Sequence, residues 1–279
     1  MNKIEIKQIV FTKINVAELI DMGEYDLDSI GDNEVAVKTV FSTISCGTEK
    51  ANITGDPNVA GGTGRIIPFP RYLGYRSSGQ VVKTGKNVTK ISEGDKVIVY
   101  NGNHKNFNIV NQNQVVKVVD GVNFSNAAVC FIATFPLAAL RKVQLEIGES
   151  ALIMGLGILG QLGVKLARNA GAYPIIAAEP VESRRKMAIE NGADYAFNPF
   201  DEDFAEKVKN STGGGVNTAC IWKILRTEYY EIIILSVIGL TGNFAFKVNK
   251  RRFFCCAFIF FVMKTFYIVV WKAFLSQSK

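Results

Sequence analysis

The stretch Ala151–Ala170 decides the fold class of this chain. It reads Ala151-Leu152-Ile153-Met154, then Gly155-Leu156-Gly157-Ile158-Leu159-Gly160, and runs on to Ala170 before Gly171. The first four residues are an apolar run of strand length, and Gly160–Ala170 has a helical composition. Between them lies a complete GxGxxG pattern. Gly155 permits a tight turn, Gly157 lets the backbone approach a pyrophosphate, and Gly160 lets the helix pack closely on the strand. The stretch predicts a strand–turn–helix unit that binds a dinucleotide at the helix N-terminus.

An acidic residue follows the glycines at the spacing that this pattern needs. Glu179 lies roughly 20 residues beyond them. A carboxylate there accepts hydrogen bonds from the adenosine ribose hydroxyls and repels a 2′-phosphate, which favours NAD. Arg184 and Arg185 follow closely and could reach a 2′-phosphate, so NADP stays an alternative, as does a glycine turn without a ligand. The predicted cofactor-binding residues are Gly155, Leu156, Gly157, Ile158, Leu159, Gly160, Glu179 and Arg184.

Strands and helices alternate around this unit. A second strand is expected at Pro174–Ala178, a helix at Glu182–Glu190, a third strand at Tyr195–Asn198 and a third helix at Asp203–Asn210. This βαβαβ order predicts an α/β fold with a doubly wound parallel sheet.

The first part of the chain is instead rich in β-branched strands. These are expected at Val35–Val40, Gly79–Val82, Lys96–Tyr100 and Val115–Val119, before an alanine-rich helix at Ala127–Leu140. We therefore expect a β-rich domain at 1–125, the dinucleotide-binding part at 126–220, and a segment of different composition at 221–279.

Composition excludes several classes of protein. The chain has 279 residues, 48% of them hydrophobic, which is too many for a disordered chain. Its formal charge is +7, but the lysines and arginines are interleaved with acidic residues along the sequence. No basic helix with interleaved aromatic residues is present in the sequence, so no nucleic-acid partner is expected. Five cysteines without a CxxC pair indicate neither a disulfide scaffold nor a zinc ribbon. The first residues lack the apolar core of a signal peptide, so a cytoplasmic location is the expectation.

Taken in order, several motifs resemble the medium-chain dehydrogenase/reductase superfamily, which includes the zinc-type alcohol dehydrogenases. The motifs are Ser45–Glu49, Leu73–Val82, Gly85–Val88, Glu93–Val97 and the glycine loop, and the resemblance spans Lys7–Ala219. It implies a GroES-like β domain followed by a Rossmann domain, and an NAD(P)-dependent oxidoreductase that acts on a small molecule. Relatives often pair through strands of the Rossmann sheet, so a homo-oligomer is left open.

The chain departs from the zinc-dependent pattern of this family. Cys46 occupies the first ligand position, but Tyr75 stands where the histidine should be and Arg76 where the glutamate should be. Cys130 lies at about the third position. Two thiols without the imidazole are a poor catalytic zinc site, so we expect no bound metal and expect Cys46 and Cys130 to be small buried residues.

Without zinc, carbonyl polarisation must come from hydrogen-bond donors. The resemblance makes Cys46, Thr48 and Tyr75 the candidates for catalytic residues, with Thr48 or Tyr75 stabilising or protonating the developing oxyanion. A packed aromatic is the other interpretation of Tyr75. His104 is the only histidine. We interpret it as structural, with a role as general acid as the alternative.

The last part of the chain does not follow the family pattern. From Ile221 onward Phe, Ile and Lys dominate and no aspartate occurs. One hypothesis is a frameshifted or degraded remnant, which would leave the Rossmann sheet incomplete and the chain a decayed, non-catalytic dinucleotide-binding protein. A membrane segment at Phe253–Leu275 is the alternative, although Lys264 would be costly in lipid. Divergent strands are the third.

Overall fold

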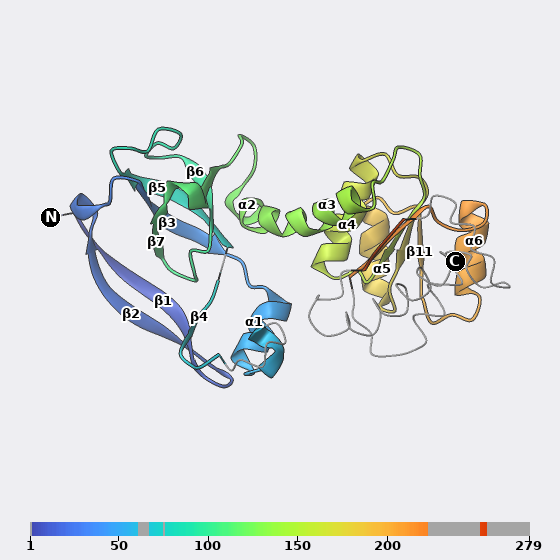
Figure 1. Ribbon diagram of the computed structural model, residues 1–279, viewed down its shortest axis with the longest axis horizontal. Coiled ribbons are helices and arrows are strands. Elements are labelled where there is room, and N and C mark those ends of the chain that lie inside the picture. The colour runs from blue at the N-terminus through green and yellow to red at the C-terminus, as the bar shows by residue number, and fades with distance from the viewer. Residues whose placement is uncertain (1, 61–66, 75, 223–251, 256–279) are drawn as a thin grey trace, which may run out of the picture. The chain divides into compact units, whose positions relative to one another are not determined.

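The computed structural model describes residues 2–60, 67–74, 76–222 and 252–255. The chain divides into two compact units, Met1–Phe131 and Ile132–Lys279. Each unit is described by itself (Figure 1). The division falls six residues after the boundary expected from the sequence.

The larger sheet of the first unit is antiparallel and holds the core of that unit. Its order is β7-β3-β5-β6-β8, from β3 (Glu34–Ser42), β5 (Arg76–Thr84), β6 (Lys96–Tyr100), β7 (Phe107–Asn111) and β8 (Val115–Lys117). β-Branched residues that alternate along these strands point to one side and form a buried cluster. Its members are Val35, Val37, Val81, Ile91, Val97, Val99, Val110 and Val115. The four strands expected in this region are thus confirmed.

A smaller sheet contains a long hairpin that the sequence did not suggest. β1 (Lys3–Lys13) pairs antiparallel with β2 (Val16–Asp26), and β4 (Arg71–Tyr72) adds to the other side of β1. The hairpin turns at Asn15, which has a φ of 59°. Asparagine tolerates this left-handed conformation better than most residues. Helix α1 (Cys46–Ile53) and helix α2 (Phe124–Cys130) also belong to this unit, with short 3-10 helices at Leu27–Ser29, Pro57–Ala60 and Gln112–Gln114.

The second unit is built on a parallel sheet. Its order is β11-β10-β9-β12-β13, from β9 (Ala151–Met154), β10 (Ile175–Ala178), β11 (Tyr195–Phe197), β12 (Thr218–Ile221) and β13 (Arg252–Cys255). The connecting helices are α4 (Ile158–Asn169), α5 (Glu182–Glu190) and α6 (Phe204–Thr212), preceded by a 3-10 turn at Phe131–Ala133 and by α3 (Thr134–Lys142). Met154 lies beside Ala178 and Ile221, so the carboxyl ends of three strands meet at one edge. Ligands of open α/β sheets bind at this edge.

Helices cover both faces of this sheet. Ala151 and Ile153 of β9 pack on one side with α3, α4 and α5, whereas Leu152 and Met154 pack on the other side with Phe204 and Val208 of α6. Figure 1 shows α5 and α6 on opposite sides of the strands. Strands buried on both faces are apolar throughout, which explains the unbroken apolar run that predicted β9. The doubly wound α/β architecture is therefore confirmed.

Two predicted segments, a helix in the first part of the chain and an apolar run near its end, agree with the structure only in part. The helix expected at Ala127–Leu140 is interrupted by the 3-10 turn between α2 and α3. Among the described residues, the helical run Phe124–Lys142 is long and apolar enough to cross a membrane, but Ala127 and Ala139 within it are fully buried in the protein. Of the segment Phe253–Leu275, only the first three residues are described, and they belong to β13, which pairs with β12. The rest of that segment lies outside the described residues.

Candidate functional site

The glycine loop joins the end of β9 to the start of α4. Gly155 has a φ of +85°, a backbone conformation that residues other than glycine rarely adopt. Its N–H donates to the carbonyl of Ala178. Gly157 is the N-cap of α4, which begins at Ile158. The chain therefore turns sharply at the carboxyl edge of the sheet and presents the N-terminus of a twelve-residue helix there. The free N–H groups and the dipole of a helix N-terminus favour an anion.

The other two glycines have different surroundings. A Cβ on Gly160 would lie 2.0 Å from the carbonyl oxygen of Gly155, so only glycine lets α4 close against the loop. A Cβ on Gly157 would meet nothing within 4 Å among the residues that the structure describes. The space at Gly157 is open, as the approach of a pyrophosphate requires. The loop therefore fits the phosphates of a dinucleotide.

Glu179 follows the last residue of β10 and faces the glycine loop. Glu179 is 1% exposed, and its Oε2 accepts a hydrogen bond of 2.8 Å from the backbone N–H of Leu156. Its Oε1 accepts a longer bond, 3.4 Å, from the N–H of Val181. The carboxylate is thus fixed against the loop through one oxygen, and the other oxygen is held more loosely.

The two arginines that follow have separate partners. Arg184 is half exposed, and its Nη1 lies 3.6 Å from Oε1 of Glu179. Arg185 donates from Nη1 to the carbonyl oxygens of Glu179 and Pro180, both at 2.6 Å. Arg185 is therefore engaged with the backbone, and Arg184 provides the positive charge that compensates the buried carboxylate.

Helix α1 carries the catalytic candidates that the structure describes. Cys46 is its first residue, and Thr48 is half-buried, with its carbonyl oxygen accepting from Nδ2 of Asn52. Glu49, on the same helix, accepts from the N–H of Ser45 through Oε1 and so stabilises the helix start. Tyr75 lies outside the described residues, so its place relative to Thr48 stays a prediction.

The residues at the family's zinc positions do not fit a metal. Cys46 and Cys130 are both exposed, so the expectation that they are buried was wrong; each lies at the end of a short helix, where little packs over it. Arg76, at the glutamate position, is 3% exposed, and its guanidinium lies 4.4 Å from the centre of the Phe131 ring. A buried guanidinium is the wrong charge for a cation site. Within the described ranges, no group of three metal-ligating side chains occurs.

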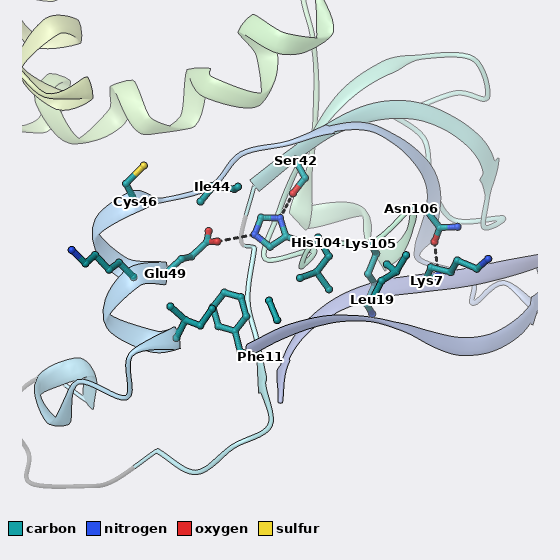
Figure 2. Close-up of a pocket in the computed structure, with 14 residues that line it drawn as sticks. Lys7, Phe11, Leu19, Ser42, Ile44, Cys46, Glu49, His104, Lys105 and Asn106 are labelled. Carbon is teal, nitrogen blue, oxygen red and sulfur yellow. Dashed lines mark hydrogen bonds and ion pairs between the residues drawn. The ribbon is translucent and has the colours of Figure 1, made fainter. Parts of the chain in front are cut away.

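His104 has two polar partners that sequence reasoning missed. Its Nε2 lies 2.9 Å from Oε2 of Glu49, and its Nδ1 contacts Oγ of Ser42. Figure 2 shows the imidazole between these two groups, with Glu49 on α1 and Ser42 at the end of β3. The three side chains line one cavity of about 780 Å³ within the first unit. No local motif joins all three, because His104 lies 62 positions from Ser42 and 55 positions from Glu49.

Comparison with known proteins agrees with both units. The family model of the alcohol dehydrogenase GroES-like domain matches residues 31–134, and that of zinc-binding dehydrogenase matches residues 159–221. L-threonine 3-dehydrogenase of Pyrococcus furiosus is 33% identical over 266 residues, which cover 84% of this chain and 74% of the relative. D-guloside 3-dehydrogenase of Escherichia coli is 28% identical over 226 residues, 75% of this chain. The chain spans only 64% of the guloside enzyme's length.

A solved structure shows the same fold. A short chain alcohol dehydrogenase from Escherichia coli, in complex with NADH, superposes with a TM-score of 0.67. It is 19% identical, and the match covers 79% of this chain and 70% of that one.

Proposed function

Because the chain belongs to the medium-chain dehydrogenase/reductase superfamily, we propose that it is an NAD(H)-dependent oxidoreductase. It transfers a hydride between the nicotinamide cofactor and a small alcohol or carbonyl compound, or an activated alkene. It does so without catalytic zinc, in the cytoplasm.

The glycine loop is the observation that carries this proposal. Gly155 makes the turn, Gly157 leaves its approach open, and Gly160 brings α4 to the end of β9. The backbone N–H groups at the start of α4 would bind the pyrophosphate of the dinucleotide. When bound, the cofactor supplies or accepts the hydride.

Glu179 supports NAD over NADP. Its carboxylate is held by Leu156 beside the glycine loop, where an adenosine ribose would bind. Oε1 would accept from a ribose hydroxyl once Arg184, its half-exposed partner at 3.6 Å, moves aside. A 2′-phosphate would meet the same negative charge and be repelled. One structural relative was solved with NADH.

Besides the cofactor, hydride transfer needs a hydrogen-bond donor that polarises the oxygen of the substrate. Arg76 stands at the glutamate position of the zinc pattern, and the described residues contain no group of three metal-ligating side chains, so we assign no catalytic metal to this site. We assign the role to the hydroxyl of Thr48 or Tyr75, as the family resemblance suggests. Cys46, which begins the helix that carries Thr48, is the third candidate. Such donors stabilise the oxyanion that develops as the hydride arrives.

Titration of the purified chain with NADH and then NADPH, followed by cofactor fluorescence, tests the proposal. We expect saturable binding that is tighter for NADH. Gly157→Val should abolish it, because the side chain enters the space of the pyrophosphate, whereas its Cβ would meet no described residue within 4 Å. An unchanged unfolding transition of this variant would show that only the site is altered. Equal binding by the variant and the parent chain would contradict the proposal.

The alternative function is dinucleotide binding without turnover. The match spans 64% of the length of the guloside enzyme, so more than a third of that relative lies outside it. Saturable NADH binding without hydride transfer to any alcohol, carbonyl or alkene in a substrate screen would favour this alternative.

The elution volume of the chain on a sizing column would decide whether it forms a homo-oligomer.

A further inference from the structure

We propose that Ser42, His104 and Glu49 form a second reactive site, in which Ser42 is a nucleophile toward esters of apolar acyl groups. This activity is separate from hydride transfer and needs no cofactor. It rests on the arrangement of three side chains and on the cavity that they line, both within the first unit.

The hydrogen bonds assign a role to each side chain. Glu49 and His104 are 4% and 8% exposed, and the bond between Glu49 Oε2 and His104 Nε2 is 2.9 Å long. A carboxylate only accepts, so the proton of this bond lies on Nε2. In the neutral imidazole, Nδ1 then carries a lone pair and accepts the hydroxyl proton of Ser42. This is the order acid–imidazole–hydroxyl, in which a histidine acts as general base for a serine.

The backbone holds the histidine rigidly in this orientation. The N–H of His104 donates to the carbonyl of Leu73, and its carbonyl accepts from Ile9, at 2.9 and 3.0 Å. Gly74 lies against the ring, where a Cβ would come within 2.5 Å of His104 Cγ. The second carboxylate oxygen of Glu49 is fixed by the N–H of Ser45. A base whose orienting group is itself fixed is preorganised for proton transfer.

The cavity determines the class of substrate. Most of the remaining wall is apolar and comes from β1, β2, the residues after β3, and α1: Ile9, Phe11, Ala17, Leu19, Ile44 and Ile53. Lys7, Lys50, Lys105 and Asn106 also line the cavity. Figure 2 shows Phe11, Leu19 and Ile44 around the imidazole. Its volume of about 780 Å³ is within the range of small-ligand pockets. An acyl chain or an aryl group would fit against these walls with its carbonyl at Ser42.

The reaction follows from these positions. Ser42 Oγ bonds to the carbonyl carbon as its proton passes to Nδ1 of His104, and the ester C–O bond breaks. The leaving alcohol takes that proton, so an acyl-serine remains. Water then attacks the acyl-serine in the same way and releases the acid. Cys46, on the cavity wall, begins α1, and the partial positive charge of this helix start favours the oxyanion.

The test uses the full chain, an alkyl fluorophosphonate probe and p-nitrophenyl butyrate. We expect the probe to label Ser42, located by peptide mapping, and the ester to be hydrolysed catalytically. Ser42→Ala should abolish labelling. His104→Gln, whose amide can still donate to Glu49, should lower ester turnover by at least about 100-fold. Ser29→Ala is the matched control, since this serine is exposed and lies outside the lining of the cavity, and it should leave both readouts unchanged.

Three results would overturn the proposal. They are no labelling of the folded parent chain, labelling that persists in Ser42→Ala, and turnover that His104→Gln leaves unchanged. NADH should affect neither readout, so loss of cofactor binding in Gly157→Val with labelling intact would separate this site from the oxidoreductase site.

Discussion

The carboxylate of Glu179 accepts the backbone N–H of Leu156 at 2.8 Å and so ties the end of β10 to the glycine loop after β9. The bond joins residues 23 positions apart. Glu179 is 1% exposed, and among the described residues its charged partner is the half-exposed Arg184, so water screens its negative charge poorly. The shape of the loop therefore depends on this side chain, and in the function proposed above the choice of cofactor depends on it too.

Glu179→Gln should weaken the discrimination between the two cofactors. The amide oxygen can still accept from Leu156, but the charge that repels a 2′-phosphate is lost. We expect the ratio of NADPH to NADH dissociation constants to fall about tenfold, or about 1.4 kcal/mol, measured by cofactor fluorescence. Glu182→Gln is the control, because that carboxylate is exposed and paired with Lys186. An unchanged ratio would show that Glu179 does not face the adenosine ribose.

Gly160→Ala should destabilise the second unit by about 1–3 kcal/mol, since the added Cβ would lie 2.0 Å from the carbonyl oxygen of Gly155. Gly163→Ala, in the same helix, is the control. Its nearest neighbour would be at 3.4 Å, and helix propensity then favours alanine. Urea unfolding of both variants measures the difference. If Gly160→Ala were as stable as Gly163→Ala, the close packing of α4 on the loop would be refuted.

Gly74→Ala should destabilise the first unit by about 2–4 kcal/mol, from the left-handed φ of +92° and from a Cβ 2.5 Å from the backbone nitrogen of His104. Gly94→Ala separates the two causes. Gly94 has a φ of +87°, but a Cβ added there would meet no described residue within 4 Å, so only the cost of the backbone conformation should appear. Thermal unfolding measures both. Equal losses in the two variants would mean that contact with His104 contributes nothing.

Asp95 should stabilise the first unit at neutral pH, and this contribution should be lost in acid. The side chain of Lys117 donates to it, and so does the N–H of Ser92, and these bonds hold the pKa of Asp95 below its ordinary value. A carboxyl whose pKa is lowered by folding contributes stability above its unfolded pKa, and this contribution is lost as the pH falls through the folded pKa.

Asp95→Asn should therefore be less stable than the parent chain at neutral pH and approach it in strong acid. Urea unfolding across a pH series gives this comparison. Lys117→Gln should raise the pKa of Asp95 toward its ordinary value, which NMR titration can follow, whereas Lys90→Gln, an exposed substitution on the same unit, should not. If the pKa of Asp95 were the same in Lys117→Gln as in the parent chain, Lys117 would not be the cause of its lowered value.

Much of the second unit could be predicted because its signals are local. β9 and α5 have the predicted bounds, and β10, α4 and α6 begin within two residues of them. Strands buried on both faces are apolar runs, and glycines mark the turn after β9, so neighbouring residues carry the pattern. The hairpin of β1 and β2 was missed. Its polar and apolar residues alternate irregularly, and the ladder has register shifts at Glu5/Lys7 and Phe11/Lys13, which break a period of two.

By itself, the sequence determined the βαβ unit, the glycine loop and the acid that follows it, since each depends on spacing along one short stretch. The tertiary structure alone decided that Cys46 and Cys130 are exposed and that Glu179 is held by Leu156. It also decided that His104 meets Ser42 and Glu49, which lie 62 and 55 positions away. Residues so far apart are brought together by the pairing of strands and the packing of a helix, and no period or motif along the chain records those contacts.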